Sequence, residues 1–221
     1  MKKIMVCSLG ILVVIAFSAC AMKKMSHEQI SGSAALIRAA WKGHVDRVKL
    51  LLDNDVNVDL QDPWGDTALM IAACNGSVEI VRMLLEKGAN ADLQDNYGNT
   101  ALRIAAKNGR VAMVRMLLAK GVNIDLQDLY DQTALMEAAK NGHIDIVRML
   151  LAKDADDELQ DEFGNTALIR AAQQGYVDIV KLLIARGVYI NASDNNEITA
   201  LMHALGNGHS EIVRMLEKEK S

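Results

Sequence analysis

Residues 62–94 read DPWGDTALMIAACNGSVEIVRMLLEKGANADLQ, and residues 95–127 repeat that stretch as DNYGNTALRIAAKNGRVAMVRMLLAKGVNIDLQ. The same shift of 33 residues brings further units into register along the chain. A Thr-Ala-Leu motif recurs at Thr67, Thr100, Thr133, Thr166 and Thr199. A glycine recurs at Gly43, Gly76, Gly109, Gly142, Gly175 and Gly208. Self-similarity at a fixed period of this length predicts a row of stacked units.

Each unit predicts two helices followed by an extended segment. Thr67 is suited to cap a short first helix, and Gly76 is suited to end it in a left-handed conformation. A second helix follows, with apolar residues at helical spacing, namely Ile80, Val81, Leu84 and Leu85. After Gly88 the chain runs extended and turns back at Gly98, which predicts a hairpin-like finger. Because one helix pair cannot bury its apolar side alone, neighbouring units must stack.

Composition narrows the fold and function classes. The chain is 51% hydrophobic with one proline and 4% aromatic residues, which favours an all-α fold. Its net charge of −4 argues against a nucleic-acid partner. Phosphate loops, nucleophile elbows and zinc-ligand spacings do not occur in the sequence. We therefore expect no enzymatic activity, cofactor or metal, and structural roles for the three histidines that share one repeat position, His44, His143 and His209.

The units resemble the ankyrin repeat, whose first helix begins Gly-x-Thr-Pro-Leu-His-x-Ala-Ala. The resemblance covers residues 30–221 as six repeats, at about 30–61, 62–94, 95–127, 128–160, 161–193 and 194–221. It implies an all-α solenoid of helix-turn-helix units joined by fingers. Alanine replaces the family proline, and the family histidine becomes Met70, Arg103, Met136, Ile169 and Met202. We expect apolar packing to replace the hydrogen bond that this histidine donates to the threonine hydroxyl.

In that family the finger tips and the exposed side of the first helices line a concave surface that binds proteins, here called the finger–helix face. Its finger positions carry a row of aromatic residues, Trp64, Tyr97, Tyr130 and Phe163. They are either binding anchors or side chains that pack between fingers and stiffen the row. The helix positions add Trp41, Lys107, Lys140 and Arg170 as partner-binding candidates, with Cys74, Ile104 and Glu137 alongside.

Exceptions to the repeat pattern predict the ends of the row and its weak points. Arg47 and Glu217 stand where internal units are apolar, so we expect them to face solvent at the two ends of a complete array. Asp154 and Asp157 replace a glycine and an apolar residue, and Glu197 replaces the finger glycine. The junctions after the fourth and fifth repeats are therefore predicted to be the least stable.

The N-terminal segment predicts export. Residues 1–19 combine Lys2 and Lys3 with an apolar run from Ile4 to Phe17, which is typical of a secretory signal and short for a membrane span. Phe17-Ser18-Ala19-Cys20 resembles the lipobox of bacterial lipoproteins, although that family prefers Leu to Phe17. The resemblance implies lipidation of Cys20 and a tether over residues 20–29. The alternative is an exported soluble protein in which Cys20 is incidental.

These features predict a protein-binding module without a nucleic-acid partner, anchored by lipid to a membrane of the bacterial cell envelope. We expect a monomer that holds or protects a protein partner there, either in the periplasm or at the surface. The alternative is a surface-exposed or secreted factor that binds a host protein.

Overall fold

The structure is a computed structural model that describes residues 32–54 and 56–219. The predicted signal peptide, Cys20 and the tether lie outside the described residues. Within them twelve α-helices form six pairs. The first helices of the pairs are α2 (Gly32–Lys42), α4 (Ala68–Asn75), α6 (Ala101–Lys107), α8 (Ala134–Lys140), α10 (Ala167–Gln174) and α12 (Ala200–Gly206). The second helices are α3 (Val45–Leu52), α5 (Val78–Glu86), α7 (Val111–Ala119), α9 (Ile144–Leu151), α11 (Val177–Arg186) and α13 (Ser210–Lys218).

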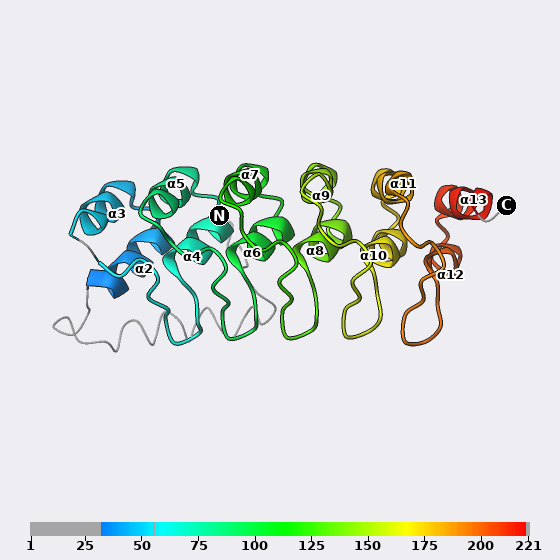
Figure 1. Cartoon of the computed structure of the whole chain (residues 1–221), viewed down its shortest axis with the longest axis horizontal. Coiled ribbons are helices and arrows are strands. Elements are labelled where there is room, and N and C mark those ends of the chain that lie inside the picture. The colour runs from blue at the N-terminus through cyan, green and yellow to red at the C-terminus, as the bar shows by residue number, and fades with distance from the viewer. Residues whose placement is uncertain (1–31, 55, 220–221) are drawn as a thin grey trace, which may run out of the picture.

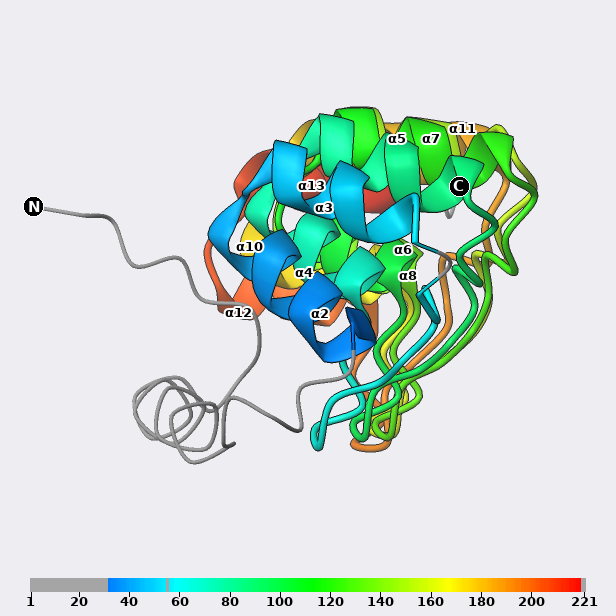
Figure 2. The ribbon, with the colours of Figure 1, turned by 90° about the vertical axis from the view of Figure 1, so that its left-hand side faces the viewer.

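The six pairs stand side by side in chain order (Figure 1). The first helices form one layer, the second helices form another, and the finger loops project from the layer of first helices. Viewed along the row, the fingers lie nearly in register behind one another (Figure 2). This arrangement confirms the predicted all-α solenoid with hairpin-like fingers.

The recurring threonine starts each first helix from α4 onward. The Thr67 hydroxyl accepts a hydrogen bond from the Met70 backbone N–H at 3.2 Å, and the other four threonines accept the equivalent bond. Each satisfies a backbone donor that the helix itself leaves unpaired, which is worth about 1 kcal/mol per cap. The predicted capping role is confirmed.

The recurring glycine that ends the first helices also makes room for the next repeat. Gly142 has φ +77°, and a Cβ built on it would lie 2.6 Å from Cε1 of Tyr176. His209 lies over Gly175 in the same way, and its Nε2 is 3.2 Å from the Gln173 carbonyl oxygen. His143 Nε2 lies 3.1 Å from the corresponding carbonyl of Lys107. At His143 and His209 the predicted structural role is confirmed, because both join adjacent repeats.

A continuous apolar core runs the length of the row, and its ends are polar as predicted. Arg47 and Glu217 are exposed, whereas Ile80 and Leu85 at the same repeat positions are 0% and 5% exposed. No buried side-chain nitrogen or oxygen in the described residues lacks a hydrogen-bond partner. The polar side chains that are buried in the row are therefore all hydrogen-bonded.

Two expectations need correction or extension. Apolar packing does replace the family histidine at the buried Met70, Met136 and Ile169. In the third repeat Arg103 is buried at this position and forms ion pairs, and in the last repeat Met202 is 55% exposed, so the expectation is wrong at both. Left-handed backbone occurs at Asp154 (φ 59°) and Glu197 (φ 62°), where glycine was expected from the pattern. The finger residue Asp131 (φ 57°), which also replaces a glycine, was missed.

Candidate functional site

Each finger is closed by its aspartate, and this turn places the aromatic residue. The Asp95 carboxylate accepts hydrogen bonds from the backbone N–H groups of Tyr97 and Asn99, both at 2.8 Å. The Gly98 N–H donates to the Asp95 carbonyl at 2.9 Å. Such a carboxylate-closed turn is a local structure that Asp forms readily. The same contacts recur in the other fingers, so the aromatic positions are equivalent in space as well as in sequence.

Adjacent fingers are joined through the backbone of the aromatic residues. The carbonyl oxygen of Trp64 accepts from the Asn96 N–H at 2.9 Å, and that of Tyr97 accepts from the Leu129 N–H at 3.0 Å. Tyr130 and Phe163 accept equivalent bonds from the fingers that follow them. The ladder fixes the backbone of the whole aromatic row, so its side chains are presented from a rigid base.

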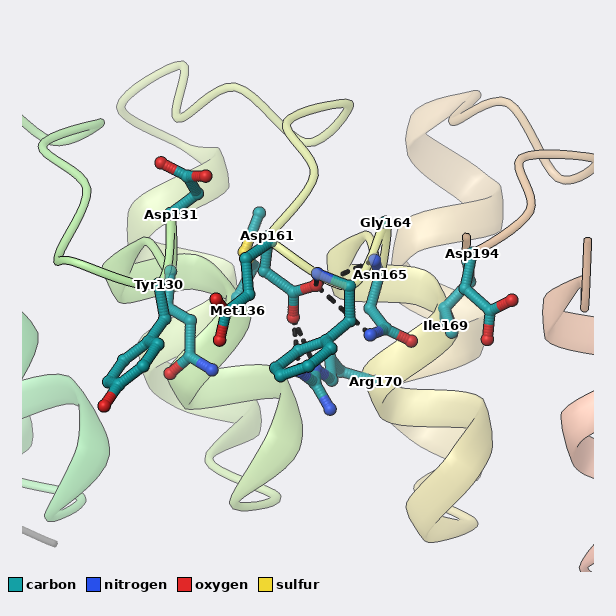
Figure 3. A network of polar contacts seen from close by, with 12 residues as sticks. Tyr130, Asp131, Met136, Asp161, Gly164, Asn165, Ile169, Arg170 and Asp194 are labelled. Atoms are coloured by element: carbon teal, nitrogen blue, oxygen red, sulfur yellow. Dashed lines mark hydrogen bonds and ion pairs between the residues drawn. The ribbon is translucent and has the colours of Figure 1, made fainter. Parts of the chain in front are cut away.

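The aromatic side chains lie largely outside the core. Tyr97, Tyr130 and Phe163 are 46%, 50% and 54% exposed, and Trp64 is half-buried. Tyr130 points away from its exposed neighbour Asp131 and toward the helices (Figure 3). Exposed aromatic groups on a fixed backbone suit protein recognition, because the backbone has little conformational entropy left to lose when a partner binds. Their role as binding anchors stays a prediction.

The helix positions of the finger–helix face differ in accessibility. Trp41 is 55% exposed, whereas Lys107 and Lys140 are half-buried at the last residues of α6 and α8. Three neighbours that the sequence placed on this surface are buried, which corrects that expectation: Cys74, Ile104 and Glu137, at 2%, 5% and 2% exposed. Packing between successive first helices covers these positions.

Arg170 is held by its own finger. Its Nε donates to Asp161 Oδ2 at 2.9 Å, and its Nη2 contacts the same oxygen (Figure 3). Asp161 also accepts from the Asn165 N–H at 2.9 Å. The Arg170 side chain is only 14% exposed, so little of it is accessible to a partner.

A buried ion cluster that the sequence analysis missed joins the third and fourth repeats. Arg103 Nη2 lies 2.5 Å from Asp128 Oδ2 and 3.1 Å from Glu137 Oε1. Its Nε donates to the Gln132 carbonyl at 3.2 Å, and Asn141 donates to Glu137 Oε2 at 3.0 Å. All three charged side chains are at most 4% exposed. The available signal was an arginine at the family histidine position with a glutamate 34 residues later.

This cluster sets the electrostatics of the two lysines. Burial lowers the pKa of Lys107, which Glu137 partly opposes, and the cations of Arg103 and Lys140 lower it further. The two carboxylates of the cluster are buried, whereas Lys107 and Lys140 are half-buried. The centre of the finger–helix face is therefore basic.

The first full finger has the opposite character. Burial raises the pKa of Asp66 to about 7, with further contributions from the carboxylates of Asp62 and Asp95. Burial also raises the pKa of Asp62. The position of Asp66 is an asparagine in the third and fifth repeats, where Asn99 and Asn165 donate to the finger aspartates.

The described residues contain no group of three or more His, Cys, Asp and Glu side chains arranged to hold a metal ion. None of the helices in residues 32–219 is both long and apolar enough to cross a membrane.

Comparisons with known proteins agree with this geometry. The sequence matches the family described as ankyrin repeats over residues 36–128, 88–161 and 135–221. The fold is similar to that of a solved protein described as "Crystal Structure of EF0377 an Ankyrin Repeat Protein", with a TM-score of 0.79 and 35% identity. That match covers 84% of this chain and 97% of the other. A search of the curated proteins found no match.

The chain belongs to the ankyrin repeat family. Members are generally non-enzymatic scaffolds that bind other proteins, which is the function class assigned to this chain.

Proposed function

We propose that this chain is a lipid-anchored ankyrin repeat protein that holds or protects a protein partner in the bacterial cell envelope, acting as a monomer through its finger–helix face. The observation that carries the binding part is the aromatic row, in which Tyr97, Tyr130 and Phe163 are exposed and Trp64 is half-buried, while the backbone is fixed by the ladder between fingers. Anchored, preorganised aromatic groups are typical of binding hot spots.

The binding experiment is affinity capture from an envelope extract with the full chain. It is run beside a variant in which Trp64, Tyr97, Tyr130 and Phe163 are all alanine. A matched control removes exposed apolar side chains elsewhere, with the changes Leu50→Ala, Val78→Ala and Tyr189→Ala. Circular dichroism must be the same for all three proteins.

The proposal expects one protein to be retained by the wild type and the control and lost by the aromatic variant. Equal retention by all three would mean that the row stiffens the fingers and that binding lies elsewhere. If none retains an envelope protein, a host protein becomes the better candidate, and protease accessibility on intact cells tests for surface exposure.

The anchoring part rests on the lipobox-like Phe17-Ser18-Ala19-Cys20 sequence. Two or three acyl chains would hold the protein on a membrane, because each buried methylene contributes about 0.8 kcal/mol. The test is fractionation of a Cys20→Ser variant. We expect the wild type in the membrane fraction and the variant in the soluble fraction, whereas a variant that stays with membranes would overturn the anchor.

A further inference from the structure

The surroundings of Lys107 carry more positive than negative charge. The charges that act on Lys107 are the cations of Arg103 and Lys140 and the carboxylates of Glu137 and Asp128. Both carboxylates are buried and form ion pairs with Arg103, and Glu137 also accepts a hydrogen bond from the Asn141 side chain. Among the described residues no carboxylate lies within 4.0 Å of the ammonium group of Lys107 or Lys140.

The basic pair is confined to two adjacent repeats. The same repeat position is Trp41 and Cys74 before it and Gln173 and Gly206 after it. Each lysine is the last residue of its helix, where the helix dipole favours a cation but supplies no carboxylate. Burial and the neighbouring cations lower the pKa of Lys107, so its charged form is incompletely compensated within the chain.

We propose that the partner reaches this face with an acidic segment, two of whose Asp or Glu carboxylates pair with Lys107 and Lys140 on the surface that also carries the exposed aromatic side chains of Tyr97 and Tyr130. The inference rests on the proposed function, since it names the chemistry of the partner for the same surface. A carboxylate supplied by a partner would neutralise each half-buried ammonium group and accept a charge-assisted hydrogen bond from it.

The spacing of the two lysines specifies the segment further. They end neighbouring packed helices, whose axes lie about 8–10 Å apart. An extended chain rises about 3.3 Å per residue and its side chains alternate between two faces, so acidic residues two apart share one face at about 6.6 Å and can reach both flexible lysine side chains.

The test is selection of twelve-residue peptides from a random phage library on the full chain, with two lysine variants selected in parallel. The first variant is Lys107→Glu with Lys140→Glu. We expect the wild type to select peptides with paired acidic residues, and the charge-reversed protein to select basic ones. Affinities of the synthesised peptides are then measured on Lys107→Gln/Lys140→Gln and on the control Lys120→Gln/Lys153→Gln. The control removes the same charge from exposed positions that follow the ends of α7 and α9.

The expected result is a loss of about tenfold or more in affinity for the Lys107/Lys140 variant and less than about twofold for the control. Peptides that depend on the aromatic row but show no acidic excess would overturn the inference and leave the proposed function standing. Peptides that bind equally to the aromatic variant would count against the proposed function instead. Failure to select any acidic peptide also overturns the inference.

Discussion

The guanidinium of Arg103 lies 2.5 Å from the Asp128 carboxylate, although the two residues belong to adjacent repeats and both side chains are 4% exposed. The pair stands at a junction that elsewhere in the row is filled by apolar side chains such as Met70 and Ile169. At this position the third and fourth repeats are therefore joined by a buried ion pair, whereas Met70, Met136 and Ile169 place buried apolar side chains there.

Removing Arg103 should be strongly destabilising. In Arg103→Met the carboxylates of Asp128 and Glu137 stay buried without their cation, and we expect a loss of about 3–5 kcal/mol in the free energy of unfolding. Urea unfolding followed by circular dichroism measures it. A loss below about 1 kcal/mol would show that water reaches these carboxylates.

A second change should restore most of that loss. The next junction has Met136 and Arg170 at these positions, and Arg170 pairs with Asp161. Adding Glu137→Arg to Arg103→Met reproduces that arrangement, because the new arginine is placed to pair with Asp128. We expect the double variant to regain most of the lost stability, and Glu137→Arg alone to be destabilising through repulsion with Arg103. A double variant no more stable than Arg103→Met would contradict this account.

Asp66 should make stability depend on pH. Its pKa of about 7 in the folded state exceeds the usual 3.8, so its contribution is fully present below about pH 3.8 and is lost as pH rises through about 7. Asp66→Asn lacks that loss and places an amide where Asn99 donates to its finger aspartate. We expect the variant to be more stable by on the order of 2 kcal/mol at pH 8, with the difference shrinking toward pH 4. Urea unfolding across this range measures it, and a difference independent of pH would contradict the assignment.

Two glycines of similar backbone conformation should respond differently to alanine. Gly142 (φ +77°) lies against the Tyr176 ring, whereas Gly121 (φ +73°) has nothing within 4 Å of an added Cβ. Gly121→Ala should lower the free energy of unfolding by only about 1–2 kcal/mol, which is the cost of left-handed backbone for a residue with a Cβ. Gly142→Ala should lower the free energy of unfolding by about 1 kcal/mol more, because the Tyr176 ring must shift. Thermal unfolding of both proteins checks the order, and equal losses would mean that the ring moves freely.

Replacing Glu197 by glycine should stabilise the last finger. Glu197 has φ 62°, a conformation that costs a side chain with a Cβ about 1–2 kcal/mol. Glycine removes this cost but has more conformational freedom in the unfolded chain, which offsets part of the effect. We therefore expect the free energy of unfolding to rise by about 0.5–1 kcal/mol. Hydrogen exchange of the Asp194 and Ile198 amides should also slow. Faster exchange would mean that the Glu197 side chain supports the turn.

The local structure follows closely from the sequence. The caps at Thr67 and its equivalents and the glycine ends such as Gly76 depend on residues within four positions of one another, so single-sequence reasoning finds them. The period of 33 residues fixes how these units stack, because only neighbouring repeats can cover one another's apolar sides. The position of the aromatic row in the fingers follows from the same period.

Only the tertiary structure decided which side chains of the predicted face remain accessible. Ile104 and Glu137 were assigned to the surface but are buried, because their exposure depends on the neighbouring repeats. The Arg103 cluster brings together residues 25 and 34 positions apart, a juxtaposition that no local pattern contains. The repeat sequence determined the architecture, whereas the stacking of repeats determined which charged groups remain accessible. It buried the carboxylates of Asp128 and Glu137 and left Lys107 and Lys140 half-exposed at the centre of the face.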